Sequence, residues 1–237
     1  MFWRIGGLTL LKISHLNFKY PNSTAINDLT MQVKEKEIVS LIGKRASGKS
    51  TLFKIIAGLQ EPDSGNIFFI GENITQNRPK SLNGKMVCLN RYYGLFNEMS
   101  VKDNIELGAW NIKDKKIFQE NLNKTLELIP HLHKQYNKNI KFLCNGEKML
   151  TAIARAIISF PKLIVIDEPT LGFYPLFAEK ILDLIHKANQ LGITFLLMQN
   201  KLENAVKISN WIYEIEDGEI IKEGDNKSFE KFDLQRY

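Results

Sequence analysis

Four residues within the stretch "LIGKRASGKSTL", residues 41 to 52, have the types and the spacing that bind a chain of phosphates. They are Gly43, Gly48, Lys49 and Ser50, in the pattern GxxxxGK[ST]. Consecutive backbone N–H groups at the start of a helix attract an anion, and glycines let it approach closely. Lys49 would reach the outer phosphates, and the Ser50 hydroxyl would bind Mg²⁺. Because a strand-like run precedes the pattern and a helix-like run follows it, we predict a nucleotide-binding loop and not an ordinary glycine turn.

Two adjacent carboxylates, Asp167 and Glu168, end a second apolar run, "KLIVIDEPT" at residues 162 to 170. Open α/β sheets bind ligands at the carboxyl ends of their strands, and phosphoryl transfer needs an acidic centre for metal and water. We therefore predict that Asp167 holds Mg²⁺, directly or through water, and that Glu168 orients the attacking water. Taken alone, such a pair is more often a solvated strand end. The phosphate loop favours the catalytic interpretation.

The spacing of apolar residues, and the glycines and capping residues that end or begin elements, predict the strands and helices that position these residues. Short apolar or β-branched runs predict strands at 10–18, 29–33 and 37–42, and a helix follows from residue 48 to Gly58. Helical spacing over residues 100–135, opened by the capping-box string "SVKD", predicts a helical insert. Strand, helix and strand resume over residues 163–198, and a hairpin turns on Asp217 and Gly218. This alternation predicts an α/β protein with a parallel sheet.

Composition narrows the class of protein. The chain has 237 residues, two cysteines far apart (Cys88 and Cys144) and a net charge of +6. No disulfide framework or zinc pattern is present, and no apolar run approaches the roughly 18 residues that span a membrane. Lysines and arginines alternate with acids along the chain, so we expect a solvated surface and no nucleic-acid partner. A reducing cytoplasm is the expected location.

With the phosphate loop, "IVIDEP" and "LCNGE" in register, the chain resembles the ATP-binding subunits of ABC transporters, most of all those for branched-chain amino acids or urea. The stretches "GLFNEMSVKDNIELGA", "DEPTLGFYP" and "LLMQN" carry the closer likeness. The resemblance implies a P-loop NTPase with a RecA-like core, an antiparallel β subdomain and a helical subdomain at about 74–158, in a single domain over 8–233. It also implies that Tyr20 stacks on adenine, although Tyr20 would equally suit the end of a core strand.

The resemblance further implies a head-to-tail dimer in which ATP and Mg²⁺ lie between one chain's phosphate loop and the other's signature segment. The residues it assigns to the chain's own nucleotide are Tyr20, Gly43, Lys44, Arg45, Ala46, Ser47, Gly48, Lys49, Ser50 and Thr51. The signature segment, which serves the partner's nucleotide, is Leu143, Cys144, Asn145, Gly146 and Glu147. Gln199 stands where the wider family has its switch histidine, so Glu168, Lys49 and Gln199 are the expected catalytic residues, with Ser50 and Asp167 on the metal. Transmembrane permease subunits are the implied further partners, and they would hold the chain on the inner face of the membrane.

The chain departs from the family at the signature segment. Cys144 replaces a serine that donates to the partner's γ-phosphate, and a lost hydrogen bond to a charged group costs about 1.5–3 kcal/mol. Asn145 replaces a glycine, and asparagine is the mildest substitute if the backbone there needs a positive φ. We expect a weakened rather than an abolished segment.

Two further departures lie near the chain's own nucleotide. Ala46 stands where the family has glycine, with Arg45 before it in place of asparagine, and we expect strain at Ala46. Arg91 takes the position of the Gln or Glu that senses Mg²⁺, the Q-loop position, unless the register slips by one and Asn90 substitutes. A cation there would repel Mg²⁺ or pair with the γ-phosphate instead.

Three functions are therefore compared. The first is ATP hydrolysis that drives transport in a dimer with a second ATP-binding subunit. That subunit is either a copy of this chain or, as the drifted segment favours, a different subunit that supplies an intact signature. The second is a regulatory ATP-binding module with little turnover, against which Glu168 argues. The third is an ABC protein acting on ribosomes or DNA, which would usually carry tandem cassettes or long coiled-coil inserts. The transported substrate is not encoded in these residues.

Overall fold

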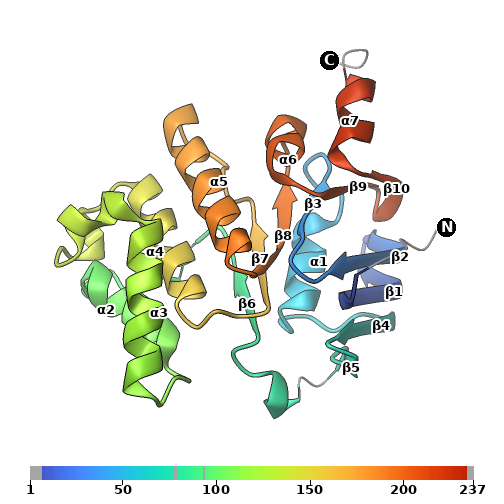
Figure 1. Cartoon of the computed structure of the whole chain (residues 1–237). Coiled ribbons are helices and arrows are strands. Elements are labelled where there is room, and N and C mark those ends of the chain that lie inside the picture. The colour runs from blue at the N-terminus through green and yellow to red at the C-terminus, as the bar shows by residue number, and fades with distance from the viewer. Residues whose placement is uncertain (1–6, 77–78, 93, 234–237) are drawn as a thin grey trace. The chain divides into compact units, whose positions relative to one another are not determined.

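The computed structural model describes residues 7–76, 79–92 and 94–233. Two compact units make up the chain (Figure 1). The first unit combines Met1–Asn83 with Met198–Tyr237, and the second comprises Gly84–Leu197. The phosphate loop belongs to the first unit, and the Asp167–Glu168 pair and the signature segment belong to the second.

The first unit contains a four-stranded antiparallel sheet in the order β2-β1-β4-β5. Its strands are β1 (Thr9–Tyr20), β2 (Ser23–Lys34), β4 (Ser64–Phe69) and β5 (Glu72–Asn73). One face is apolar and buried, with Ile13, Leu16 and Leu29 each 0% exposed. The strand predictions for 10–18 and 29–33 are confirmed, since both runs lie inside β1 and β2. The short strands β4 and β5 were not predicted.

The same unit carries the strands and helices around the phosphate loop. They are β3 (Ile38–Ile42), α1 (Lys49–Ile56), η1 (Lys80–Leu82), α6 (Leu202–Ile208), β9 (Trp211–Glu216), β10 (Glu219–Gly224) and α7 (Asn226–Asp233). Strand β3 is buried along its whole length and pairs in parallel with β9. Helix α1 ends as predicted, because Gly58, at φ 72°, donates to Ile55 O while Leu59 donates to Lys54 O.

Strands β9 and β10 form the predicted antiparallel hairpin. Its turn residues Asp217 and Gly218 have φ values of 47° and 83°, which is the left-handed pair that a type I′ turn requires. The Gly218 carbonyl accepts from Asn27 N–H at 3.0 Å, and Gly218 N–H donates to Ser47 O at 3.1 Å. The hairpin turn is therefore bonded both to β2 and to the phosphate loop.

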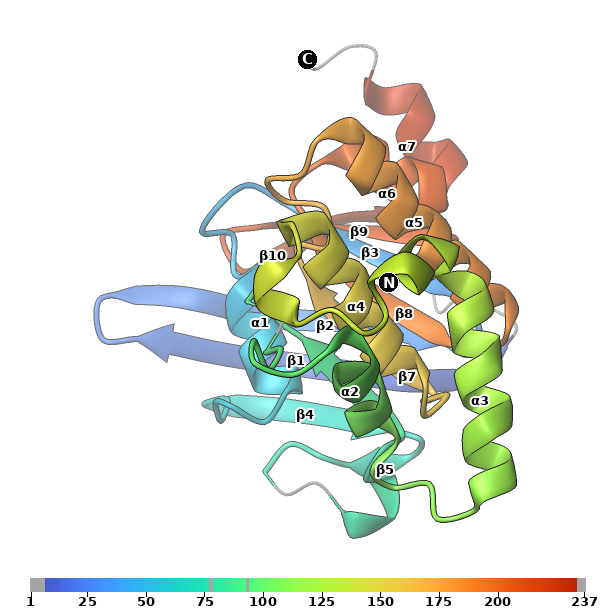
Figure 2. The same cartoon turned by 90° about the vertical axis from the view of Figure 1, so that its left-hand side faces the viewer.

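The described residues of the second unit form further strands and helices. They are β6 (Met86–Leu89), α2 (Val101–Glu106), η2 (Leu107–Ala109), α3 (Lys115–Leu128), η3 (Pro130–Gln135), η4 (Ile140–Phe142), α4 (Asn145–Ile157), β7 (Leu163–Asp167), α5 (Pro175–Gln190) and β8 (Thr194–Gln199), whose last two residues pass into the first unit. Strands β6 and β7 run parallel, from Met86 opposite Leu163 to Leu89 opposite Ile166. Helix α4 packs against α2, α3 and α5 (Figure 2).

The predicted helical insert is confirmed by α2, α3 and the short helices between Leu107 and Phe142. Ser100 caps α2 with a full capping box, in which Asp103 N–H donates to Ser100 Oγ and Ser100 N–H donates to the Asp103 carboxylate. The bounds 74–158 for a helical subdomain and 8–233 for the whole domain stay predictions. In the described parts of the chain, no helix combines the length and apolar character needed to cross a membrane.

Candidate functional site

The phosphate loop joins β3 to α1 and is held closely by the rest of the first unit. A Cβ at Gly43 would lie 2.4 Å from Ile215 O, and one at Gly48 would lie 2.4 Å from Ala25 O. Gly48 also has φ 107°, as the N-cap of α1. Both glycines of the motif are therefore required by close packing, and Gly48 by backbone conformation as well.

Lys49 is the first residue of α1, and its side chain folds back along the loop. Its ammonium group donates to Gly43 O at 2.6 Å, to Lys44 O at 2.8 Å and to Ser47 Oγ at 3.3 Å. The residue is 5% exposed. The loop carbonyls thus satisfy a buried positive charge, and phosphate oxygens that bind the Lys49 ammonium would replace these carbonyls as its acceptors.

The remaining loop residues differ in exposure. Lys44, Arg45, Ala46 and Ser50 are exposed, whereas Ser47 and Thr51 are 6% and 8% exposed. Ala46 has φ 64°, in the left-handed region that costs an alanine about 1–2 kcal/mol. The backbone at Ala46 therefore has the strain that we expected, and the loop still connects β3 to α1 through Gly43 and Gly48.

Tyr20, at the end of β1, lies beside the start of α1. Its hydroxyl is 3.4 Å from Thr51 Oγ1, and its ring meets Phe18 edge to face with centroids 5.0 Å apart. Tyr20 is half-buried. The structure brings Tyr20 to the helix that follows the phosphate loop, and stacking on adenine stays a prediction.

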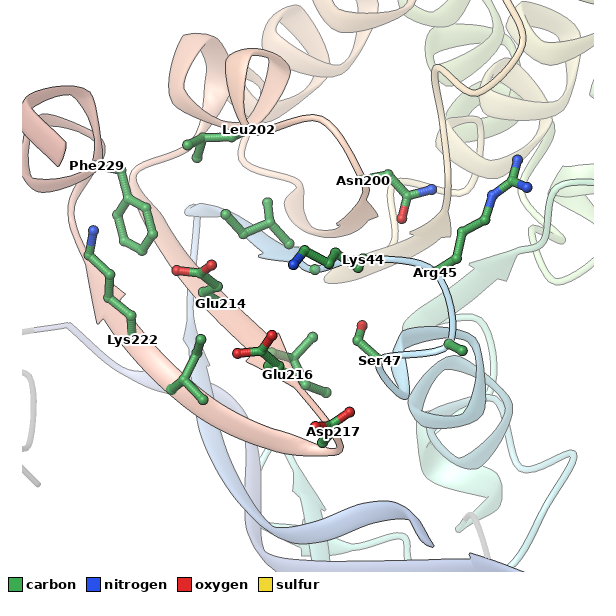
Figure 3. A pocket seen from close by; sticks show the side chains of 15 residues that line it. Lys44, Arg45, Ser47, Asn200, Leu202, Glu214, Glu216, Asp217, Lys222 and Phe229 are labelled. Carbon is green, nitrogen blue, oxygen red and sulfur yellow. The ribbon is translucent and has the colours of Figure 1, made fainter. Parts of the chain in front are cut away.

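A pocket of about 480 Å³ lies between the phosphate loop and the β9–β10 hairpin (Figure 3). Its walls include Gly43 to Ser47, the acids of β9 and its turn, and Asn200. Arg45 extends away from the acids, and Lys44 points toward the side on which Glu214 lies (Figure 3). Sequence reasoning missed this pocket, because its acidic wall comes from a hairpin about 170 residues beyond the loop.

Gln199 takes no part in that pocket. It is 1% exposed, and its Nε2 donates to Ser40 Oγ at 2.9 Å. Asn200, the next residue, lines the pocket instead. A catalytic role for Gln199 stays a prediction, and no motif in the sequence singles out Asn200.

In the second unit, Asp167 ends the fully buried strand β7 and is 6% exposed. Glu168 follows with φ 56°, and its carbonyl accepts from Leu171 N–H at 3.3 Å. A left-handed glutamate is strained, and such strain gathers at functional positions. The carboxylates therefore stand at the carboxyl end of a buried strand, where the prediction placed them. The roles of Asp167 on Mg²⁺ and of Glu168 on water remain predictions.

Arg91 follows the parallel neighbour β6, whose last residue Leu89 pairs with Ile166. Its guanidinium donates to Tyr92 Oη at 3.1 Å and lies 5.1 Å from the centre of that ring. Arg91 also shares a shallow pocket with Asn145 and Lys148. The Q-loop position thus lies near the start of the signature helix within this unit.

The signature segment forms the N-terminus of α4, with Cys144 as its N-cap and Leu143 6% exposed just before it. The Glu147 carboxylate accepts from Cys144 N–H at 3.0 Å, so Glu147 caps the helix. A Cβ at Gly146 would lie 2.3 Å from Phe177 Cδ1 on α5. Asn145 is the first helical residue and needs no positive φ, which removes that reason for expecting strain there.

No group of three His, Cys, Asp or Glu side chains within the described ranges is placed to hold a metal ion. The oxygen donors that the sequence assigns to Mg²⁺, Ser50 and Asp167, are of the hard type that this ion prefers. Mg²⁺ commonly binds through one or two such groups together with substrate phosphates. Each of the two residues therefore has the donor type that suits Mg²⁺, and their joint binding of the ion with a nucleotide stays a prediction.

Comparison with known proteins decides the family. The family model described as "ABC transporter" matches residues 26–171, which is more than half of the chain. The chain belongs to the ABC transporter ATP-binding family.

Relatives across this family are similar over most of the chain. It is 30% identical, over 90% of its length and 91% of the relative's, to the high-affinity branched-chain amino acid transport ATP-binding protein BraG of Pseudomonas aeruginosa. It is 34% identical, over 90% of its length and 79% of the relative's, to the energy-coupling factor transporter ATP-binding protein EcfA2 of Clostridium perfringens.

Solved structures agree. An ATP-binding cassette of an ABC transporter in its ADP conformation matches with a TM-score of 0.85 at 25% identity, over 97% of this chain and 96% of that one. The protein cbiO1 of Clostridium perfringens, part of an ABC transporter complex, matches with a TM-score of 0.84 at 26% identity, over 94% and 91%. The predicted fold class, an α/β P-loop NTPase with an antiparallel sheet and a set of helices, is confirmed. The chain is therefore an ATP-binding subunit of an ABC transporter, with the ATPase domain of that family.

Proposed function

We propose that the chain binds ATP with Mg²⁺ at its phosphate loop and hydrolyses it to drive uptake of a small polar solute through separate membrane permeases. Lys49, Ser50, Asp167 and Glu168 would act on its own nucleotide. The observation that carries the proposal is the phosphate loop itself, whose buried Lys49 ammonium is enclosed by loop carbonyls at 2.6 and 2.8 Å. Amino acids are the first solutes to test, because BraG serves a branched-chain amino acid system.

The closing partner is proposed to be a second, different ATP-binding subunit. The residues for the chain's own nucleotide keep the family pattern at Lys49, Asp167 and Glu168, while Cys144 and Asn145 have drifted in the segment that serves the partner's nucleotide. A heterodimer would confine the effect of the drifted signature segment to the partner's nucleotide and would supply an intact signature segment to the nucleotide of this chain. In such a pair, binding of ATP would close the two subunits on each other, and hydrolysis of ATP would let them separate.

Permease contact is supported by exposed apolar side chains of the second unit. Tyr92, Phe96, Trp110 and Phe142 are 54 to 74% exposed. Contiguous apolar patches commonly mark interaction sites, whereas single exposed apolar side chains are ordinary, so these four side chains are candidates for the permease contact. Contact with permeases would keep the chain on the cytoplasmic face of the membrane.

A regulatory module that closes on ATP with little turnover is the second candidate. The observations that favour it are Arg91 at the Q-loop position and the weak donor Cys144 in the signature segment. Glu168 argues against it, since a module that only binds needs no group to orient water.

The test is a titration of purified chain with candidate second subunits while phosphate release is measured. We expect the rate of phosphate release from the mixture to be well above the sum of the rates of the two chains measured separately. Equal activity with and without every partner would contradict the heterodimer. Uptake of labelled amino acids into vesicles that contain the matching permeases then tests the solute, and ATP hydrolysis without any uptake would leave transport unsupported.

A further inference from the structure

The pocket between the phosphate loop and the β9–β10 hairpin is distinct from the place of the nucleotide. Among the described residues that line it, Lys49, Ser50 and Thr51 are absent, although these are the residues that would hold phosphate and metal. Every residue that does line the pocket belongs to the first unit. Its volume of about 480 Å³ is in the range that small-molecule sites occupy. The pocket can therefore hold a second ligand beside the loop.

One wall of this pocket is acidic. Glu214 and Glu216 alternate along β9 and Asp217 follows at the turn, so their carboxylates form a row beside the pocket (Figure 3). Glu214 is half-buried, and no hydrogen bond or ion pair joins its carboxylate to the residues that the structure describes. Such a row repels a polyphosphate and attracts a cation.

The cation that suits this wall is organic and not a metal ion. Residues two apart on a strand lie about 7 Å apart along it, so Glu214 and Glu216 are too widely spaced to enclose one ion. Within the described ranges, no three acidic, histidine or cysteine side chains are placed to hold a metal. Much of the remaining lining is apolar and would contact a hydrocarbon chain; it includes Ile42, Leu202, Ile221 and Phe229.

Phe229 already contacts an ammonium group at this pocket. The Lys222 Nζ lies 4.2 Å from the centre of the Phe229 ring, which is a cation–π contact, and both residues line the pocket. Lys222 and Lys44 offset only part of the charge of the three carboxylates, because Arg45 extends away from them (Figure 3). The pocket therefore combines a negative wall with an aromatic and aliphatic surface.

We propose that this pocket binds a small aliphatic ammonium compound, with its charged group on Glu214 and Glu216 and its carbon chain on the apolar lining. Charge-assisted hydrogen bonds and burial of the chain both contribute to such binding. A free amino acid and a polyamine share this chemistry, and they differ in the second charged group. The site goes beyond the proposed function, because it takes a ligand other than ATP.

The pocket is joined to the phosphate loop by shared residues. Gly43 to Ser47 line it, and Ser47 O accepts from Gly218 N–H at 3.1 Å, in the turn that carries Asp217. The charge of the carboxylates therefore opposes a polyanion in the loop, and a bound ammonium group would offset it. Each ligand should then raise the affinity of the other by the same factor. This cooperative step, unlike the site itself, rests on the proposed function.

An NMR titration of the full chain without nucleotide tests the site. Butylamine is the probe, and butyrate, with as many carbon atoms and the opposite charge, is its control. We expect butylamine to bind and butyrate not to bind. Failure of butylamine to bind, or equal binding of the two compounds, would overturn the proposal.

Carboxamide variants locate the bound amine. Glu214→Gln should weaken butylamine binding by about tenfold, the size of one hydrogen bond between charged groups. Glu216→Gln, at an exposed position, should also weaken it and changes no half-buried side chain. The matched control is Glu223→Gln, an exposed acid of β10 outside the pocket, which should alter the affinity by less than about twofold. Equal effects of all three substitutions would contradict binding in this pocket.

Leucine and putrescine distinguish the two sources of the ligand. Leucine adds a carboxylate to the ammonium group, and putrescine adds a second ammonium group. Tighter binding of leucine than of butylamine would identify an amino acid, and tighter binding of putrescine would identify a polyamine. If neither compound exceeds butylamine, the pocket recognises the single ammonium group and its chain, as the proposal states.

Binding of Mg-ADP with and without saturating butylamine, at constant ionic strength, tests the cooperative step. Butylamine should raise the affinity for ADP by about two- to fivefold, the size of a partly exposed charge interaction, and Glu214→Gln should abolish the rise. An unchanged affinity with butylamine bound would contradict the cooperative step. A chain that binds butylamine and no nucleotide would contradict the proposed function and leave the site supported. A chain that binds nucleotide and no butylamine would contradict the site alone.

Discussion

The ammonium group of Lys49 donates to the carbonyl oxygen of Gly43 at 2.6 Å, and so joins the two ends of the phosphate loop. Lys49→Ala removes this charge, and we predict that it weakens ATP binding by about tenfold or more, because hydrogen bonds to charged groups contribute about 1.5–3 kcal/mol. Calorimetric titration with Mg-ATP measures the change. Lys54→Ala, an exposed lysine at the other end of α1, is the matched control. Equal binding by both variants would contradict the assigned role.

Gly146 has no room for a side chain, since its Cβ would lie 2.3 Å from Phe177. Gly146→Ala should therefore lower the free energy of unfolding by about 1–3 kcal/mol, as overpacking does. Chemical denaturation measures this value. Adding Phe177→Leu should recover part of the loss because it shortens the obstructing side chain. A Gly146→Ala chain as stable as the original would show that α4 and α5 separate easily.

The drifted signature can be restored by Cys144→Ser with Asn145→Gly. Serine is a better N-cap than cysteine and donates a stronger hydrogen bond, so turnover with a partner subunit should rise. Steady-state phosphate release from the mixed subunits is the measurement. Cys88→Ser, at a half-buried cysteine in β6, controls for the loss of a thiol. Unchanged turnover would mean that this segment faces no catalytic site.

Arg91 places a positive charge at the Q-loop position. Arg91→Gln should lower the Mg²⁺ concentration needed for half-maximal ATP hydrolysis by up to about fivefold, the size of an exposed charge interaction. Lys148→Gln removes the neighbouring cation of the same pocket and is the matched control. A larger fall in the required Mg²⁺ concentration for Lys148→Gln than for Arg91→Gln would contradict this prediction. It would show that the charge of Lys148 on α4, and not that of Arg91, opposes Mg²⁺.

The cap of α2 makes a prediction about pH. Hydrogen bonds from the Ser100 side chain and backbone hold the pKa of Asp103 below its ordinary value of 3.8. Because the folded pKa is the lower one, the carboxylate stabilises the fold above about pH 3.8, and this stability is lost as the pH falls through the folded pKa. Ser100→Ala should raise the pKa of Asp103 toward its ordinary value in an NMR titration. An unchanged pKa would show that the Ser100 hydroxyl contributes nothing to it.

Local rules explain what the sequence could predict. The type I′ turn at Asp217–Gly218, the capping box at Ser100 and the helix stop at Gly58 each depend on a few adjacent residues with distinctive backbone preferences. The phosphate loop belongs to the same group, because its glycines and lysine are contiguous. The structure confirms each of these elements where the pattern placed it.

Contacts between distant segments could not be read from spacing. Phe177, which lies on another helix, leaves no room for a side chain at Gly146. Gln199 donates a hydrogen bond to Ser40, which lies on another strand. The strain at Glu168 was equally hidden, since glutamate has no preference for a positive φ that would reveal it. Helices α6 and α7 were missed because each has only 7 or 8 residues and so shows little periodicity.

Single-turnover hydrolysis shows whether Glu168 of this chain directs water onto ATP held at its own phosphate loop. The chain and its Glu168→Gln variant are each mixed with a partner subunit whose own glutamate is replaced, so that only the site of this chain can turn over. We expect release of about one phosphate per chain, and a fall of about 100-fold or more in rate for Glu168→Gln, as loss of a general base produces. Equal rates for the two chains would contradict it and favour the regulatory module.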